Sequence, residues 1–536
     1  MIVVPDSDII LIKSPLKLDN YNQITFGNAS AQESYFLSLP HLEYDGCTYQ
    51  RKDGVIRYNT DKEDNINAPR FEDLLRYNYC MYKNDSYENK WFYAFVTDIK
   101  YINDGMSEVT IETDVFQTWQ FNINYMNSFI EREHVSNDTI GLHTIPEGLE
   151  TGEYIVNNWN KNDTLTNYSI LVASTIDLDT YTSDGGASYG GVYQGYNLYR
   201  FSNTSAGHLA LQNKLMQMNQ DQKLDSIIGI FLCNVMFYTT DSVNEGSKIT
   251  PENTPRGFTW GRGGSPSDTP IQKLNTLNGY NPHNNKMKTY PFMYLLLDNG
   301  NGSQAIYRYE DFNSATCEFD IIGTPSFGGS YFATPLNYGG TPTDNYKNRL
   351  HGGKIPTCGF QNDTFINWLT ANSVPIVTGI VEDSIQIGLG AGGVAGGYAG
   401  GGLEILHGVS GIANTINSLE QHSKMPPQHV GNADTGDVNF VSGQTTFTAY
   451  AMSIKYEYAK MIDDFFTMYG YKVNRLALPN IHKRANWDYM KCIDVNLEGD
   501  IPEKDLDKIR SLFNNGCTFW HNTSTFLNYS ASNGIL

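Results

Sequence analysis

Residues 91–112 read WFYAFVTDIKYINDGMSEVTIE and carry one of the clearest strand signals in the chain. The first six residues are continuously apolar, which is typical of a strand that is buried on both faces. Asn103-Asp104-Gly105 is a turn signal, and apolar and polar residues alternate in the stretch after it. The segment therefore predicts a β-hairpin, and we expect further short strands at 9–13 and 168–174.

The amino-acid composition of the whole chain also favours β-strands. Aromatic residues make up 13% of the 536 residues, including 36 Tyr and 26 Phe, and such residues favour strands. The 49 Gly indicate many turns between short strands. The predicted fold class is therefore mainly β (α+β), and a chain of this length is expected to form two to four domains.

Changes in amino-acid composition along the chain suggest where those domains lie. We expect a β-rich N-terminal part at 1–174, a loop-rich β insertion at 175–374, a hydrophobic glycine-rich part at 375–435 and a C-terminal α/β part at 436–536. Helical periodicity predicts packing helices at 449–469 and from Asp500 to Gly516. For the second helix, Asp500 and Glu503 suggest a capping box.

The formal net charge of −21 bears on the partners of the protein. An acidic chain repels phosphates, so sequence-specific binding to nucleic acid is disfavoured. Passage of DNA without binding stays compatible with this charge, because the wall of a conduit should not hold DNA.

Residues 384–419, SIQIGLGAGGVAGGYAGGGLEILHGVSGIANTINSL, are the most unusual stretch, and we call them the glycine-rich segment. Glu404 is its only charged residue. The literal GxGxxG at 388–393 suggests a dinucleotide loop, but the helix that must follow would contain five more glycines, each costing about 1 kcal/mol. A flexible linker is a second reading, although linkers are usually more polar. A buried pair of helices is a third.

The fourth reading, a conditional membrane-active loop, fits this composition best. Its glycines recur four residues apart, a spacing that lets helices approach closely in lipid. We expect these loop glycines to be Gly392, Gly393, Gly396, Gly397, Gly400 and Gly401. The apolar residues expected to meet the membrane are Ile385, Ile387, Leu389, Val394, Tyr398, Leu403, Ile405, Leu406, Val409, Ile412, Ile416 and Leu419.

Residues suited to catalysis or metal binding are sparse, so we expect no catalytic residue, no metal and no cofactor. Glu131-Arg132-Glu133-His134 combines acids, a cation and a base, yet a structural ion-pair network is the expected role. The eleven His show no HExxH spacing. Asp463-Asp464 and the acids at 503–507 suggest solvated helix faces.

Five stretches of the sequence form a recognisable set: NKWFYAFV at 89–96, DVFQTW at 114–119, FIEREHV at 129–135, YGYKVNR at 469–475 and the stretch from Gly499 to Gly516. Together they resemble the tail knob proteins of φ29-like short-tailed phages (podoviruses). The resemblance covers about 70–175 and 375–525, and it is weak over about 180–370.

The resemblance implies a structural virion protein. It also implies that six copies form a hexamer and build tail-tube-like β-barrel rings. Hydrophobic loops would plug this DNA conduit and then penetrate the host cell membrane. Implied partners are the lower collar or proximal tail tube, the tail tip, the host membrane and passing genomic DNA. The protein would be made in host cytoplasm and act at the envelope. An alternative is a receptor-binding or wall-degrading tail component, hosted by the 180–370 insertion.

Overall fold

The computed structural model describes residues 7–47, 50–60, 69–84, 90–162, 165, 167–239, 244–264, 268–300, 302–326, 329–339, 346–354, 357–359 and 446–536. The described chain is mainly β, as predicted, with a few helices. It divides into two compact units. Unit 1 comprises 1–150, 282–286 and 457–536, and unit 2 comprises 151–281 and 287–456.

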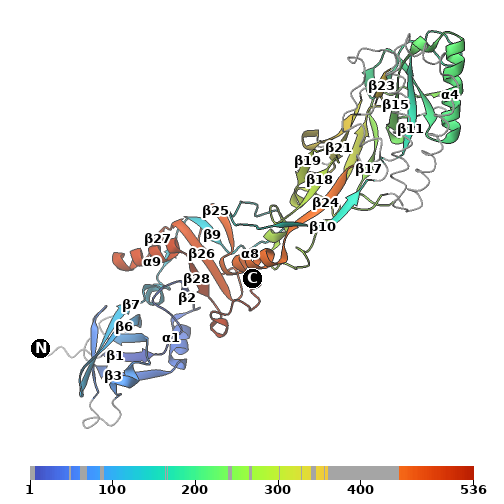
Figure 1. Ribbon diagram of the computed structural model, residues 1–536. Coiled ribbons are helices and arrows are strands. Elements are labelled where there is room, and N and C mark those ends of the chain that lie inside the picture. The colour runs from blue at the N-terminus through green and yellow to red at the C-terminus, as the bar shows by residue number, and fades with distance from the viewer. Residues whose placement is uncertain are drawn as a thin grey trace, which may run out of the picture. The chain divides into compact units, whose positions relative to one another are not determined.

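A six-stranded antiparallel sheet forms the N-terminal part of unit 1 (Figure 1). In spatial order its strands are β3 (His41–Cys47), β1 (Ser7–Ile12), β5 (Tyr79–Asn84), β6 (Phe92–Asn103), β7 (Met106–Thr113) and β4 (Val55–Asn59). The predicted hairpin is confirmed as β6 and β7, and the expected strand at 9–13 is confirmed as β1. The helices here are α1 (Ala29–Ser38), α2 (Phe71–Leu74) and α3 (Val115–Trp119). Phe36 of α1 packs with Tyr79 and Tyr93 in the core.

A second sheet of unit 1 joins strands that lie far apart in sequence. Its order is β2 (Asn22–Ile24), β28 (Cys517–Trp520), β26 (Trp487–Asp494), β9 (Ser128–Glu133) and β25 (Tyr471–Ala477). The strands β8 (Asn124–Tyr125) and β27 (Leu497–Glu498) pair separately. Figure 1 shows α8 (Tyr456–Tyr469) and α9 (Glu503–Asn515) with this sheet.

The two C-terminal helices correct part of the sequence prediction. Residues 448–454, expected to be mostly helical, form a strand, and only the rest of the expected helix is α8. The α9 N-cap is Pro502, without a side-chain hydrogen bond, so the expected capping box is wrong. Gly470 ends α8: its φ is +65°, and an added Cβ would lie 2.2 Å from the carbonyl oxygen of Glu133.

The part of unit 2 that the structure describes contains three larger sheets and one small hairpin. The first has the order β10 (Tyr154–Lys161), β24 (Thr448–Ile454), β18 (Met293–Asp298) and β19 (Gln304–Tyr307). The second has the order β17 (Arg256–Trp260), β20 (Phe319–Gly323), β21 (Ser330–Pro335) and β22 (Leu350–Lys354). Tyr307 and Phe319 join the two sheets, with ring centroids 5.0 Å apart.

The third sheet of unit 2 carries the helix α4 (Ser205–Gln220). Its order is β16 (Ser247–Lys248), β14 (Asn197–Ser202), β11 (Tyr168–Ser174), β15 (Ile227–Asn234) and β23 (Thr357–Gly359). Met218 of α4 packs with Val172 and Phe201 in a buried cluster. The hairpin pairs β12 (Ser188–Tyr189) with β13 (Val192–Tyr193). Short 3-10 turns complete the described elements: Leu224–Ser226, Val235–Phe237, Asn285–Lys288, Tyr309–Asp311, Tyr346–Asn348 and Thr523–Thr525.

Candidate functional site: the strands that flank the glycine-rich segment

The predicted membrane-active residues all fall between residues 360 and 445, outside the described residues. This holds for the twelve apolar side chains from Ile385 to Leu419 and for the six loop glycines. What the structure describes is the chain on either side of this stretch. The chain leads into residues 360–445 through β22 and β23, and it leaves them into β24.

The approach strand β22 lies against a fully buried ring. Tyr331 of β21 has no exposed surface, and a Cβ added at Gly352 would lie 2.1 Å from its Cε2 atom. A side chain at this position would therefore displace the ring or the strand. After β22 the chain changes sheets, because β23 pairs with β15 through Cys358 and Ile230.

The return strand begins at the same ring. Phe447, which is 1% exposed, meets Tyr331 in a T-shaped contact with centroids 5.7 Å apart. Its carbonyl oxygen accepts a hydrogen bond of 3.0 Å from the backbone N–H of Asn162. β24 then runs between β10 and β18 as an interior strand. We call Tyr331, Gly352 and Phe447 the segment base, because one buried ring contacts the chain on both sides of residues 360–445.

The segment base was not anticipated from the sequence. Its members are distant in sequence, and Tyr331 and Phe447 look like ordinary core aromatics. The pair Gly352-Gly353 inside a strand pattern was the available signal, since glycine within a strand often marks a close approach of other groups. Within the described part of the chain, no helix combines the length and the apolar character needed to cross a bilayer.

The predicted ion-pair network at residues 131–134 is present in unit 1. Glu133 is fully buried and pairs with Lys483 and Arg475. Arg132 pairs with Glu147, which also pairs with Lys286. Every carboxylate of this group faces a cation, so the arrangement is that of structural ion pairs joining β9 to neighbouring segments.

His134 lies buried beside this network and is held as a neutral imidazole. Its Nδ1 accepts a hydrogen bond of 2.8 Å from the N–H of Tyr489, and Nε2 lies 3.1 Å from the carbonyl oxygen of Thr467. These partners require the proton to sit on Nε2. Burial lowers the pKa of His134 to about 4, although the carboxylate of Asp488 opposes this shift.

Two acids that were expected on solvated helix faces are instead buried. The Asp463 carboxylate accepts hydrogen bonds from the backbone N–H groups of His283 and Asn284, at 2.8 and 3.0 Å. Asp505 accepts from Trp119 Nε1 at 2.9 Å and pairs with Lys52. Both predictions were wrong because the helix pattern alone does not show which distant groups need an acceptor.

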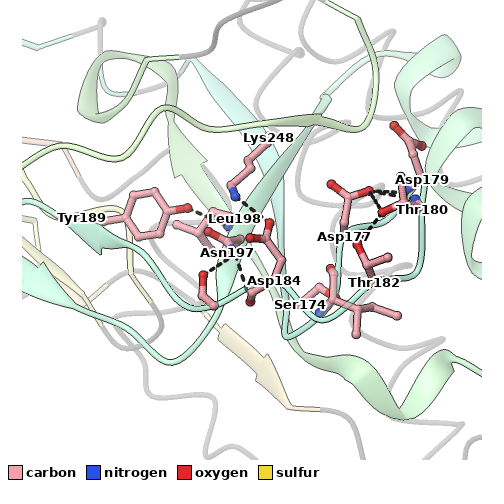
Figure 2. Close-up of polar contacts among 12 residues, drawn as sticks. Ser174, Asp177, Asp179, Thr180, Thr182, Asp184, Tyr189, Asn197, Leu198 and Lys248 are labelled. Atoms are coloured by element: carbon pink, nitrogen blue, oxygen red, sulfur yellow. Dashed lines mark hydrogen bonds and ion pairs between the residues drawn. The ribbon is translucent and has the colours of Figure 1, made fainter.

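A polar loop cluster at the start of the predicted insertion is the other candidate in the described chain, and Figure 2 shows its contacts. Asp177 Oδ1 accepts hydrogen bonds of 2.9 and 2.8 Å from the N–H groups of Asp179 and Thr180. Asp184 pairs with Lys248 at 2.6 Å. These carboxylates are engaged in closing the loop. In the described residues, no three His, Cys, Asp or Glu side chains converge as metal ligands would.

Comparison with known proteins shows similarity along nearly the whole chain. Residues 259–534 match the family model described as Bacillus phage phi29, tail knob protein gp9, C-terminal domain. Residues 6–124 match the model described as caudoviral major tail protein N-terminus.

Individual relatives agree with these models. The chain is 25% identical to tail knob protein gp9 of Bacillus phage PZA, over 98% of each chain. It is 25% identical to tail knob protein gp9 of Bacillus phage phi29, over 86% of this chain and 88% of the relative. The solved tail knob protein gp12 of bacteriophage C1 has a TM-score of 0.61 at 17% identity, over 99% of this chain and all of the other, which shows a shared fold.

Proposed function

The chain belongs to the phi29 gp9 family of phage tail knob proteins, and from this premise we propose that it forms a distal tail tube that opens the host membrane. As a family member it is a structural component of the virion of a short-tailed phage. In the proposal, copies of the chain surround a channel for DNA, and the glycine-rich segment plugs that channel until it enters the membrane.

The segment base is the observation that carries this proposal. The chain on both sides of residues 360–445 packs against one buried ring, Tyr331, at Gly352 and Phe447, and β23 pairs with β15 between Gly352 and residue 360. An apolar segment that is attached at both ends to a packed sheet can change its surroundings while the sheet keeps its hydrogen bonds. Conditional insertion requires this combination, because the conduit must survive the release of the segment.

The charge of the chain supports the conduit. With 58 acidic against 37 basic residues, the protein lacks the excess of Lys and Arg that holds nucleic acid. DNA would therefore pass without being retained. We further propose a hexameric ring, joined to the proximal tail tube or lower collar and to the tail tip, as the family resemblance implies.

We propose no catalytic role for the chain. The engaged acids at 131–134 and the polar loop cluster support this, as do the relatives named for a structural part of the virion. A zymogram on host cell walls tests it, since clearing by the purified chain would overturn the assignment.

The experiment for the membrane role replaces residues 385–419 by a Gly/Ser linker of equal length. We expect this variant to assemble like the wild type but to release no dye from liposomes, and phage carrying it to lose infectivity. A matched control changes only Glu404→Gln, which keeps the apolar surface and should keep dye release. Leakage that persists in the linker variant would contradict the proposal.

A further inference from the structure

The four-stranded sheet β10–β24–β18–β19 has an unusual outer face. Its inner face is ordinary core, with Leu295, Leu297 and Ala451 buried. Strand pairing sets the outer side chains in two rows across the sheet. The rows are Val156, Met452 and Tyr294, and then Trp159, Tyr450, Leu296 and Ile306. We call these seven residues the unit-2 apolar face.

Every residue of the two rows is apolar or aromatic, and the edge members are open to solvent. Trp159 is 61% exposed, Ile306 50% and Val156 49%. A sheet with one solvated face normally alternates apolar and polar side chains. The six-stranded sheet of unit 1 does so: Arg57 and Glu108 are cross-strand neighbours on its outer side, with Arg57 Nε 3.0 Å from Glu108 Oε1. The unit-2 apolar face therefore has the pattern of a face that is covered.

A partner that covers this sheet would dock on its face rather than add a strand at β10. At the edge, β10 carries an irregularity between Val156 and Asn158, where Asn157 donates a hydrogen bond to Ser453 Oγ and accepts one from the N–H of Asn278. A bulge of this kind blunts an edge strand against the addition of another strand. A partner would therefore be bound through the apolar side chains of the unit-2 apolar face.

The size of the face fits a protein interface. With about 150–250 Å² for a full aromatic side chain, the exposed apolar surface is on the order of 400 Å². That is about half of the roughly 800 Å² that each partner contributes to a stable interface. A polar rim would supply the rest, as is usual around an apolar centre.

The charges around the face distinguish between partners. At one end, Lys161 and Asp298 lie in the same cross-strand row, and at the other Lys455 pairs with Glu153. An anionic lipid surface or a nucleic acid needs an excess of cations, which this balanced rim does not offer. A chain of net charge −21 repels its own copies wherever its surface is acidic, so a contact between copies needs a neutral, apolar patch.

We propose that the unit-2 apolar face is the surface by which one copy of this chain packs against the next. The proposal rests on the proposed function, which requires copies to stand side by side around a channel. It adds the location of the contact: the outer face of β10, β24, β18 and β19, with Trp159 at one edge and Ile306 at the other.

Sedimentation velocity of the purified chain tests this contact. Trp159→Asp and Ile306→Asp place a charge in the face at two separate strands, and Leu209→Asp, on the exposed side of α4, is the matched control in the same unit. We expect each face variant to self-associate at least about 30-fold more weakly than the wild type, because each change puts a charge in place of a large apolar side chain of the contact. The control should associate normally.

Unchanged circular dichroism and thermal unfolding verify that the variants fold. The proposal is overturned if folded face variants assemble like the wild type, if the wild type stays monomeric, or if the face variants lose only liposome binding. The membrane role is judged separately, because the 385–419 linker variant keeps this face. Normal assembly with persistent leakage would remove the membrane role and leave the contact in place.

Discussion

The ring of Tyr331 meets the ring of Phe447 edge to face, with an interplanar angle of 77°. Tyr331 belongs to β21, and Phe447 directly precedes β24, so the contact joins two sheets of unit 2. Both side chains are almost completely buried. The return from residues 360–445 is therefore fixed by core packing before β24 begins.

Phe447→Ala tests how strongly this contact holds the return strand. Removing a buried Phe leaves a cavity, and the expected loss of unfolding free energy is about 3–5 kcal/mol. Urea unfolding of the whole chain measures it. Leu209→Ala, at an exposed position on α4, should change stability by less than about 0.5 kcal/mol. Equal stabilities of the two variants would show that Phe447 does not anchor the strand.

Glu133→Gln tests the ion pairs of β9. The change leaves Lys483, whose side chain is 5% exposed, as a buried cation without its carboxylate. We expect a loss of about 3–5 kcal/mol in unfolding free energy. Glu131→Gln is the control on the same strand, because its pair with Lys491 is partly exposed and should contribute under about 1 kcal/mol. Similar losses for both variants would contradict the structural role of Glu133.

Asp463→Ala tests the anchoring of the segment 282–286. The change removes the acceptor of two backbone N–H groups, those of His283 and Asn284. The expected cost is about 1–3 kcal/mol, because the buried N–H of Asn284 would be left without a partner. Hydrogen exchange at the two amides should accelerate. Asp464→Ala, at an exposed position paired with Lys460, should leave their exchange unchanged.

The lowered pKa of His134 leads us to expect that the folded protein loses stability in mild acid. Its pKa is lowered from 6.5 to about 4 in the folded protein, chiefly by burial, with Asp488 opposing and Arg484 and Lys483 adding to the shift. The unfolded chain therefore binds more protons between these pH values, so stability is full above pH 6.5 and falls as pH drops towards 4. A shift of this size corresponds to about 3 kcal/mol.

The His134→Asn variant separates this effect from other titrations. Asp114 acts in the opposite direction, since burial raises its pKa to about 6 and thus favours the fold at low pH. Unfolding free energies of wild type and variant, measured from pH 7 to pH 4, should converge as the pH falls. Parallel curves would mean that His134 does not carry the predicted linkage.

The sequence predicted those elements whose signals are local. The β6–β7 hairpin has its apolar run, turn residues and alternation within residues 91–112, and it forms as expected. β24 was mistaken for helix because Ile454 fits the apolar stripe of α8, whereas the strand is stabilised by pairing with β10 and β18. Those partners lie more than one hundred residues away, where no periodicity within β24 can indicate them.

The candidate site divides in the same way. Low charge and regularly spaced glycines distinguish residues 384–419 in the sequence. The predicted membrane activity depends on this composition, which can be seen without the structure. The segment base depends on which distant ring touches which strand, and that is decided by packing. Asp463 and Asp464 illustrate the limit: they are adjacent and identical, yet one is buried and the other is about half exposed.

The division of the chain into two units has a mechanical consequence. Since unit 1 contains 1–150, 282–286 and 457–536, the backbone passes between the units at four points. Tension on the particle would be shared among four covalent connections in parallel. A protease cut at any single connection would divide the chain into two fragments but leave the units joined by the other three connections, so one nick would not free either unit to diffuse away.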